Sequence, residues 1–417
     1  MLSRIRPSVV LVLAQMVAEG SAFLRNLILA RLIGAEQMGL AVALALGIRV
    51  IEMFSDFGLK RLLVQVRSSE LDRVRGVVHL VRAAKACVLM VCAMLLAVPL
   101  TGAINSALSP AMFMLAATAI VFRGLANCDY RERQRQRDFT GVLLVEGGSN
   151  LAALMVIAPI AIATRDYTAL VWASLVQATV LCALSHLIAK RPMSWLLDMA
   201  TIKKALRFGV PIACNGALIF LAMQGDRLIV AVHFTPEELA KFAIAAQIAL
   251  FPTLAGARFL LAFDLPRFAR LVDEPSEMRL QFKNRLIFVS GVALLLALGL
   301  GILGNAAIGL LFGAGFVSAP TIMALLAVVA GVRLIRAVPN TLLMATGRTS
   351  IMLACNLPRI LAIFIALAFI AYGAGLVQVV AIGMVSEAIS LLLGLSAVAG
   401  IGRHQFSLKH SSVEMSS

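Results

Sequence analysis

The chain has 417 residues, of which 61% are hydrophobic and only 14% are charged. A soluble globular domain is about 45–50% apolar and about 25% charged, so this composition excludes an ordinary soluble enzyme or binding module. The formal net charge of +16 would also suit a nucleic-acid-binding protein, but the placement of the bases along the chain indicates a membrane topology instead.

Long apolar stretches recur through the whole sequence, and each is close to the roughly 20 residues that an α-helix needs to span a bilayer. In chain order they predict twelve membrane-crossing helices, near residues 8–30, 37–58, 77–100, 110–127, 140–163, 168–188, 208–233, 239–262, 286–312, 318–345, 350–371 and 375–399. Lipid-facing strands would instead alternate apolar and polar residues over about ten positions. The sequence therefore predicts an all-α integral membrane protein.

The basic residues fall almost wholly before the first stretch, in every second gap and in the tail, where 25 of the 37 Lys and Arg residues lie. The gaps on the other side carry only Arg31, Arg165 and Lys241. Because short basic loops stay in the cytoplasm, this asymmetry predicts a multi-pass protein with both termini cytoplasmic. The basic run at residues 131–137 then reads as a topology determinant that contacts lipid headgroups, and we expect no nucleic-acid partner.

The gaps expected on the outer side are short, the longest being about nine residues, so none can hold a soluble catalytic domain. The two halves resemble each other weakly: aligning Glu36 with Glu237 also brings residues 55–59 beside residues 256–260. Six crossings per half give both halves the same orientation, which predicts two six-helix lobes related by a parallel pseudo-repeat. We expect an N-terminal lobe at 1–188, a cytoplasmic amphipathic linker at 189–207, a C-terminal lobe at 208–400 and a cytoplasmic tail at 401–417.

Several ionisable residues lie inside the predicted crossings, where a charge costs about 2.5–3.5 kcal/mol at a helix centre if it faces lipid. The bases are Arg25, Arg49, Arg82, Lys85, Arg227, Arg258, Arg333, Arg336 and Arg359. The acids are Glu19, Glu52, Asp56, Glu146, Asp226 and Glu387. The surplus of bases predicts a polar interior that suits an anionic group, and arginine forks match phosphate oxygens.

The spacing of the charged residues along the predicted helices shows which of them share a helical face, but it leaves their roles open. Arg49 and Glu52 can pair on one helical face, so a structural pair and a substrate role are equally open for Arg49. Arg333 and Arg336 also share a face, and because no acid lies close in sequence we expect them to line a cavity. Glu387 is isolated in sequence, so it could equally hydrogen-bond between helices.

Particular motifs resemble those of bacterial polysaccharide biosynthesis flippases, the O-antigen and exopolysaccharide translocases of the multidrug/oligosaccharidyl-lipid/polysaccharide exporter superfamily. The two most specific are LRNLILARLIGAEQMGL at residues 24–40 and FSDFGLKRLLVQ at residues 54–65. Looser matches follow in order at residues 207–211, 226–229, 265–266, 310–316 and 345–348. One departure is the loop at residues 235–241, where the family usually has two glycines.

The resemblance implies a transporter, not an enzyme, of the bacterial inner membrane. It would move undecaprenyl-diphosphate-linked oligosaccharide repeat units to the periplasmic leaflet by alternating access, for O-antigen, exopolysaccharide or capsule assembly. A proton or sodium gradient would drive it, with no cofactor or metal. The expected substrate-cavity residues are Arg25, Arg49, Arg333, Arg336 and Arg359; the expected ion-coupling or lobe-interface residues are Asp226, Glu52 and Glu387.

Two other functions stay open at this point. A cation-coupled drug or metabolite antiporter of the same superfamily would usually need interior acids for cationic cargo, whereas bases outnumber acids here. A membrane glycan polymerase or ligase would usually carry a sizeable outer loop. Besides membrane lipids, glycosyltransferases and a polysaccharide polymerase are possible partners at the basic cytoplasmic loops.

Overall fold

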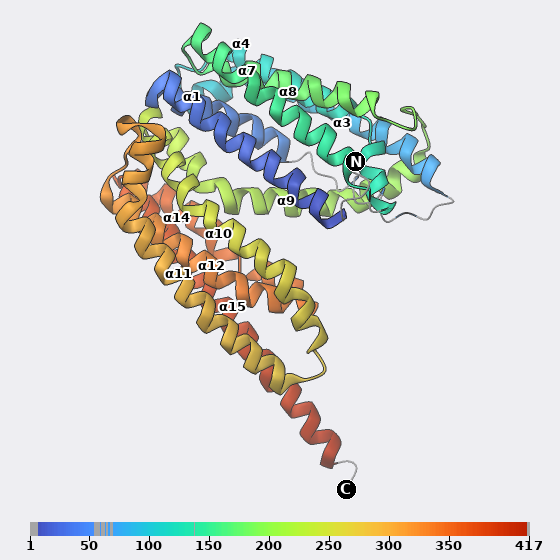
Figure 1. Ribbon diagram of the computed structural model, residues 1–417, viewed down its shortest axis with the longest axis vertical. Coiled ribbons are helices and arrows are strands. Elements are labelled where there is room, and N and C mark those ends of the chain that lie inside the picture. The colour runs from blue at the N-terminus through green and yellow to red at the C-terminus, as the bar shows by residue number, and fades with distance from the viewer. Residues whose placement is uncertain are drawn as a thin grey trace. The chain divides into compact units, whose positions relative to one another are not determined.

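The computed structural model describes residues 7–53, 70–136 and 138–414, together with the single positions 59, 63 and 66. All regular elements in these parts of the chain are helical (Figure 1). Ten helices there are long and apolar enough to cross a membrane, or up to eleven if the bent pair Pro110–Leu125 and Asp129–Gln136 counts as one crossing. The second family-like motif, at residues 54–65, and the end of the second predicted crossing lie mostly outside the described residues.

The first two predicted crossings form one long element, α1 (Pro7–Glu52), which has a break at Gly34. Its 46 residues would extend about 69 Å as one straight helix, roughly twice the hydrocarbon thickness. At the break Gly34 has φ 79° and ψ 176°, a conformation essentially restricted to glycine because it has no Cβ. The two crossings predicted at 8–30 and 37–58 thus meet at a glycine-dependent turn.

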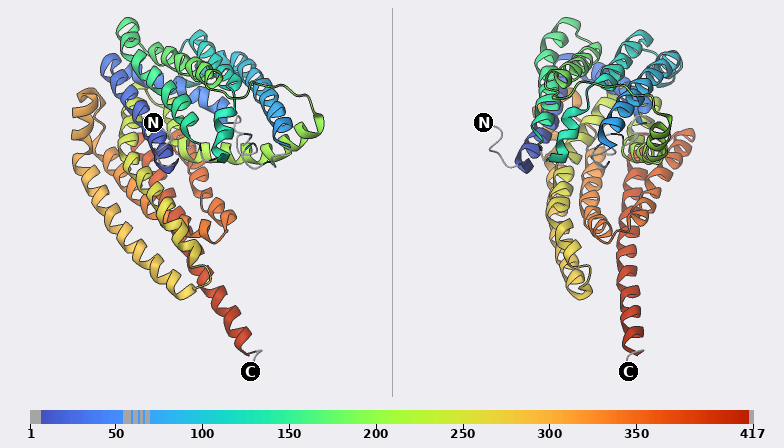
Figure 2. Two further views of the ribbon diagram at one scale, coloured as in Figure 1. Left: turned by 45° about the vertical axis from the view of Figure 1, so that its right-hand side comes forward. Right: turned by 90° about the vertical axis from the view of Figure 1, so that its right-hand side faces the viewer.

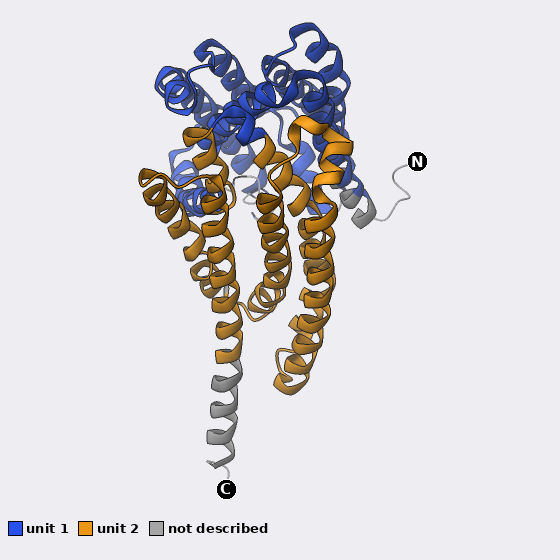
Figure 3. Cartoon of the chain, turned by 90° about the vertical axis from the view of Figure 1, so that its left-hand side faces the viewer, with its two compact units in different colours: residues 1–221, 235–240 blue, residues 222–234, 241–417 orange. Residues whose placement is uncertain are grey.

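The chain divides into two compact units (Figure 3). The first comprises residues 1–221 and 235–240. It contains α1, α3 (Leu71–Ile104), α4 (Pro110–Leu125), α5 (Asp129–Glu132), η4 (Arg133–Gln136), α6 (Thr140–Val142), η5 (Leu143–Gly147), α7 (Gly148–Thr164), α8 (Thr168–Leu187) and the start of α9 (Met199–His233). Small residues allow close helix contacts here: a Cβ on Gly124 of α4 would lie 2.3 Å from the Cβ of Ala86 on α3.

The second unit comprises residues 222–234 and 241–417. It contains the end of α9, most of α10 (Pro236–Arg270), α11 (Pro275–Phe312), η6 (Ala314–Phe316), α12 (Pro320–Ala345), α13 (Thr349–Ala354), α14 (Leu357–Ala371) and α15 (Leu376–Glu414). The long helix α11, yellow to orange in Figure 2, packs on α12, and α12 and α14 both pack on α15. The outward side of α11 exposes Leu295, Ile302 and Leu310, as expected of a helix that faces lipid.

Helix boundaries depart from the predicted crossings at two informative places. Residues 190–198 have no helix and α9 begins at Met199, so the second half of the predicted linker is the first part of a crossing helix. The predicted eleventh crossing divides into α13 and α14, with Pro358 in the first turn of α14. Hydropathy detects the part of a helix within the hydrocarbon and misses its polar extension outside it. The predicted domain limits stay a prediction.

The departure at residues 235–241 has a structural explanation. Thr235 and Glu238 form a reciprocal cap at the start of α10: the Thr235 Oγ accepts from the Glu238 amide at 3.2 Å, and a Glu238 carboxylate oxygen accepts from the Thr235 amide at 3.0 Å. Pro236 occupies the first helical turn, where its missing amide proton costs nothing. The cap therefore forms the start of α10 in a loop that contains no glycine.

Candidate functional site

Three arginines of the second unit converge on one buried glutamate. Arg333 and Arg336 lie one turn apart on α12, and Arg359 follows the proline that opens α14. All three reach Glu387 of α15: Arg333 Nε lies 2.5 Å and Arg359 Nε 2.9 Å from Oε1, and Arg336 Nη2 lies 3.4 Å from Oε2. We call these four residues the α12–α15 cluster. No acid lies close to Arg333 and Arg336 in sequence, and Glu387 is isolated there too, but α12 and α14 both pack on α15 and so bring these residues together.

The α12–α15 cluster is deeply buried and keeps a surplus of positive charge. The side chain of Glu387 is 1% exposed and that of Arg359 is 6% exposed. Neutral groups satisfy two of the guanidiniums in part: Arg336 donates to the Asn356 carbonyl oxygen at 2.8 Å, and Arg359 donates to the Met223 sulfur at 3.4 Å. Three bases face one acid, so two positive charges are uncompensated within the cluster.

Hydrogen-bonding capacity remains open beside these charges. The Nε of Arg336, the Oδ1 of Asn340 and the Oγ of Ser390 are buried and make no hydrogen bond with any described residue. Asn340 lies one turn after Arg336, and Ser390 lies one turn after Glu387, so both share the faces that carry the cluster. Buried polar atoms are normally paired, and unpaired ones mark a polar site that has further partners.

Asp226 of α9 lies on the edge of the same region. Its carboxylate acts electrostatically on Arg359 and accepts a hydrogen bond at 2.8 Å from the backbone amide of Arg227. Helix α9 approaches α14 closely at this level, since a Cβ on Gly225 would lie 2.3 Å from a side-chain carbon of Ile363. Asp226 is therefore near the cluster while belonging to another helix.

The first unit contains a second group of intramembrane charges. Glu52 pairs with Arg123 at 2.7 Å, and Arg49 lies one turn before Glu52 on α1. The charges of Arg49 and Arg123 both act on Arg25, so the three guanidiniums lie near one another. We call Arg25, Arg49, Glu52 and Arg123 the α1–α4 cluster. It also holds three bases and one acid, but it is more open: Arg49 is exposed and the side chain of Arg123 is 38% exposed.

A chain of neutral polar groups extends from the α1–α4 cluster. Arg25 donates to Gln177 of α8 at 3.2 Å, and Gln177 donates to Asn150 of α7 at 2.9 Å. Asn150 in turn donates to the backbone oxygen of Glu146 at 2.7 Å. Three helices therefore contribute to one polar path inside the apolar part of the unit.

The structure brings together some of the predicted residues and separates others. Arg333, Arg336, Arg359 and Glu387 form one cluster; Arg25, Arg49 and Glu52 belong to the other, in a different unit. Glu52 forms its ion pair with Arg123, where the sequence had offered Arg49. The roles of all these residues stay predictions. Within the described residues, no group of three His, Cys, Asp or Glu side chains could hold a metal ion.

Sequence reasoning missed Arg123 and the neutral partners Gln177, Asn150 and Asn356. Arg123 lies in the last turn of α4, next to a basic loop, and was therefore not among the bases expected inside the membrane. The amide side chains inside the apolar stretches could have indicated these partners in the sequence. Considering only charged residues leaves out the groups that hydrogen-bond to them.

The arrangement defines a class: a multi-pass, all-helical membrane protein with the fold of flippases and multidrug transporters. The solved lipid II flippase MurJ in its inward closed conformation is similar, with a TM-score of 0.73 and 13% identity over 93% of this chain and 87% of that chain. An inward-facing multidrug resistance MATE family transporter of the MOP superfamily has a TM-score of 0.71 and 12% identity, covering 96% of this chain and 99% of that one. The predicted fold class is confirmed.

Sequence comparison gives the family. The family model for polysaccharide biosynthesis proteins matches residues 28–321, so the chain belongs to that family. A Klebsiella pneumoniae protein described as an uncharacterized membrane protein in the cps region is 20% identical over 376 residues, which cover 89% of this chain and 77% of that protein. The family resemblance predicted from the motifs is thereby confirmed.

Proposed function

We propose that this protein translocates polyprenyl-diphosphate-linked oligosaccharide repeat units across the bacterial inner membrane for polysaccharide assembly. Membership of the polysaccharide biosynthesis family and a fold shared with a lipid II flippase support this assignment. The lipid would be undecaprenyl diphosphate, and O-antigen, exopolysaccharide or capsule would be the product. By the distribution of basic residues, both termini would lie in the cytoplasm.

The observation that carries the proposal is the surplus of positive charge in the α12–α15 cluster. A purely structural ion pair needs one base per acid, and each additional buried charge in the membrane costs about 2.5–3.5 kcal/mol at a helix centre. Three arginines around Glu387 thus form an unfavourable arrangement until an anion binds. A diphosphate diester brings one negative charge on each phosphate, which matches the surplus, and arginine binds phosphate oxygens through two donors at once.

The more open α1–α4 cluster has the same surplus and the same chemistry. Its exposed Arg49 and half-exposed Arg123 suit a first contact with the diphosphate. Amide groups such as Gln177 suit sugar hydroxyls, because an amide both donates and accepts. We therefore assign substrate contact to Arg25, Arg49, Arg333, Arg336 and Arg359.

A transmembrane proton or sodium gradient would drive transport, and Asp226 is the best candidate for coupling among the three predicted acids. Glu387 forms ion pairs with three arginines and Glu52 forms one with Arg123, so bases of the protein already occupy both carboxylates. Asp226 makes no ion pair within 4.0 Å to any described residue and is half-buried, which suits a group that binds and releases a cation.

Removing only the surplus charge tests the proposal. Arg336→Gln with Arg359→Gln leaves Arg333 paired with Glu387 at 2.5 Å. In a strain that depends on this protein, we expect polymer export to be lost and lipid-linked repeat units to accumulate on the inner leaflet. The protein level in the membrane should equal that of the wild type. Arg336→Lys with Arg359→Lys keeps the charge and should retain measurable export.

The control removes a pair elsewhere in the second unit whose acid is as deeply buried as Glu387. Arg285 pairs one-to-one with Asp264 at 2.7 Å, and the Asp264 side chain is 2% exposed. Arg285→Gln with Asp264→Asn removes one positive and one negative charge without changing the surplus, so export should persist. Wild-type export by the Arg336/Arg359 double glutamine variant would refute a role for the surplus charge in transport.

The similarity in fold to a multidrug resistance MATE family transporter supports a second candidate function, that of a cation-coupled drug or metabolite antiporter. The basic surplus in both clusters opposes cationic cargo. Uptake of cationic dyes into vesicles containing the purified protein would favour that function, and absence of uptake together with loss of lipid translocation in the double glutamine variant would favour the flippase.

A further inference from the structure

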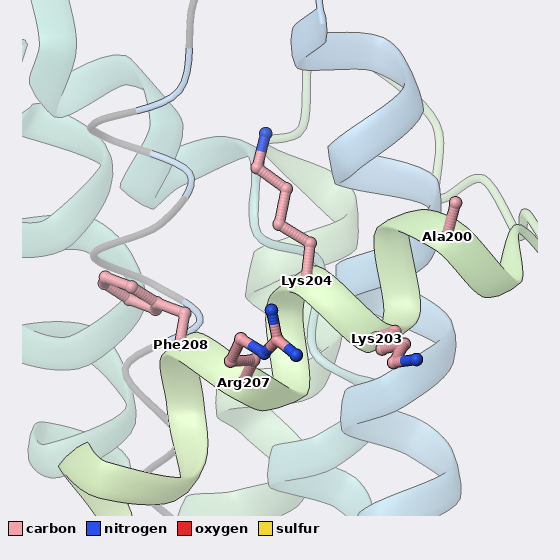
Figure 4. A pocket seen from close by; sticks show the side chains of 5 residues that line it. All are labelled: Ala200, Lys203, Lys204, Arg207 and Phe208. Atoms are coloured by element: carbon pink, nitrogen blue, oxygen red, sulfur yellow. The ribbon is translucent and has the colours of Figure 1, made fainter.

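The first unit has a basic cavity that neither charge cluster includes. It has a volume of about 620 Å³ and is lined by Ala200, Lys203, Lys204, Arg207 and Phe208 (Figure 4). All five residues lie in the first turns of α9, and Lys203 and Arg207 are one turn apart on the same face. Lys203, Lys204 and Arg207 are exposed, so a ligand can reach them.

The segment that precedes α9 is held to the rest of the first unit by hydrogen bonds. We call residues 188–198 the linker strap. Its backbone is held by side chains of the unit: the Lys190 amide donates to Asp129 at 3.0 Å, Asn127 donates to the Arg191 oxygen at 3.0 Å, and the Ser194 oxygen accepts from His79 at 3.2 Å. The strap that precedes α9 is therefore anchored to α3, to α5 and to the residues just before α5.

The end of the strap adds two more ties. The Leu196 amide donates to the Gly76 oxygen at 3.3 Å, and a Cβ on Gly76 would lie 2.8 Å from that of Leu196, so the two chains are in close contact. Asp198 accepts from Arg73 at 2.6 Å and from the Thr201 hydroxyl in the first turn of α9. The basic side chains thus project from a preorganised helix end, which reduces the entropy lost on binding.

The length of α9 and the side chains beside the cavity place it, by expectation, at the depth of the lipid headgroups. Helix α9 has 35 residues and is about 52 Å long, whereas the hydrocarbon core is about 30 Å thick, so some 20 Å of the helix extends beyond it. The strap exposes Trp195 and Leu197, and Met199 at the helix start is also exposed. Tryptophan concentrates where hydrocarbon meets headgroups, so these side chains mark the membrane interface beside the cavity.

The lining has the chemistry of a phosphate site. Among the described residues no acidic side chain lines the cavity, and Lys204 pairs with Glu70 at 3.5 Å, where both side chains are exposed. An exposed pair of that kind is weak, so the Lys204 ammonium remains available. Arginine and lysine bind phosphate oxygens, and Phe208 and Ala200 offer apolar surface for a glycerol or acyl group.

We propose that this cavity binds the phosphate headgroup of an anionic phospholipid of the adjacent leaflet. A free phosphate would use the same basic groups, but it would gain nothing from the exposed Leu197, Met199 and Val210 that flank the site in sequence. A lipid places its phosphate among the bases and its acyl chains along those apolar side chains. The site is independent of the α12–α15 cluster and of the transported substrate.

The test measures lipid binding by the full-length purified protein in detergent, without transport. A fluorescent phosphatidylglycerol is titrated, and unlabelled phosphatidylglycerol, phosphatidylcholine and inorganic phosphate are added as competitors. We expect saturable binding that phosphatidylglycerol displaces and that equal concentrations of inorganic phosphate or phosphatidylcholine do not. Displacement by inorganic phosphate as effective as that by phosphatidylglycerol would overturn the assignment to a lipid.

Substitution locates the site. Lys203→Gln, Lys204→Gln and Arg207→Gln together should weaken binding by about 100-fold, because each base near a membrane surface contributes about fivefold. The matched control neutralises three exposed bases outside the cavity, Arg267, Arg279 and Lys283, and should leave binding within about threefold of the wild type. Equal weakening in the two triple variants, or none in the cavity variant, would overturn the proposal. Unchanged melting temperatures exclude misfolding as the cause.

Discussion

Removal of Glu387 and removal of Arg359 should affect stability very differently, although both residues belong to the same buried cluster. Glu387 is the acid that three guanidiniums share, at 2.5, 2.9 and 3.4 Å. Glu387→Gln keeps the side-chain shape and one acceptor but leaves three positive charges with no anion. Arg359→Gln leaves Glu387 paired with Arg333 and Arg336 and lowers the surplus by one charge.

The magnitudes follow from the cost of buried charges. Removing one partner of a buried ion pair costs about 3–5 kcal/mol, so Glu387→Gln should destabilise the protein by about that amount. Arg359→Gln loses one ion pair, but it also removes a surplus base that costs about 2.5–3.5 kcal/mol in the membrane. These two effects oppose each other, so the net change should lie within about 1 kcal/mol. The two variants should then differ by at least about 2 kcal/mol, roughly 30-fold in the unfolding equilibrium constant.

Equilibrium unfolding by SDS in mixed micelles gives the comparison, with both variants and the wild type measured in the same detergent. Arg285→Gln supplies a reference in which one partner of a one-to-one pair is removed, because it leaves Asp264 buried without its base. It should resemble Glu387→Gln. If Arg359→Gln destabilises the protein as much as Glu387→Gln does, the cluster is balanced in charge and the surplus on which the proposed function depends does not exist.

Two further predictions concern the first unit. Gly39→Ala should destabilise it by about 1–3 kcal/mol in the same unfolding assay, because the new Cβ would lie 1.8 Å from the backbone oxygen of Pro236. The hydrogen bonds from the Thr201 hydroxyl and the Arg73 guanidinium hold the pKa of the Asp198 carboxyl below its usual value. The protection factors of amides in the linker strap should therefore persist down to about pH 4 and fall only as the pH drops through the lowered pKa.

Each of these has a control. A methyl group added at Gly20 would meet no atom within 4 Å, so Gly20→Ala should be neutral or stabilising, and an equal loss in both glycine variants would contradict the close approach at Gly39. Asp198→Asn should lower the protection factors at every pH, without the loss of protection that the wild type shows as Asp198 is protonated. If the protection of the strap amides in the wild type is lost near the ordinary aspartate pKa, the pKa of Asp198 is not lowered.

The membrane crossings could be predicted from the sequence because continuous apolar length is a direct measure of bilayer thickness. The turn at Gly34 falls in the gap between two predicted crossings, where glycine permits a conformation closed to other residues. The start of α9 at Met199 could not be predicted in the same way. Its first turns carry the bases Lys203, Lys204 and Arg207, so a hydropathy profile assigns this part of the helix to a loop.

The candidate residues could also be predicted, since a charge inside an apolar stretch is costly and requires a polar surrounding. Their partners could not. Arg333 and Glu387 are 54 residues apart and meet only because α12 packs on α15. Likewise Arg123 reaches Glu52 across 71 residues. Local spacing identified only pairs within one helix, such as Arg49 with Glu52, and the packing of distant helices selected a different base.

The two clusters also bear on the internal repeat. Arg123 stands thirteen positions after Pro110, the residue that opens α4, and Arg333 stands thirteen positions after Pro320, which opens α12. Helix α4 packs on α3 as α12 packs on α11, so the two arginines occupy corresponding places in the fourth and tenth crossings.

Their acidic partners do not correspond, because Glu52 belongs to the second crossing and Glu387 to the twelfth. A role in folding alone would require the pair to be kept together, whereas here the base recurs and the acid that accompanies it changes helix. Recurrence of the base alone is what a repeated requirement for a positive charge at this depth would produce. It supports the assignment of both clusters to an anionic substrate, and it predicts that Arg123→Gln should reduce polymer export as Arg333→Gln does, with the protein level in the membrane unchanged in each. If either Arg123→Gln or Arg333→Gln leaves export unaffected, the two arginines correspond in structure but not in function.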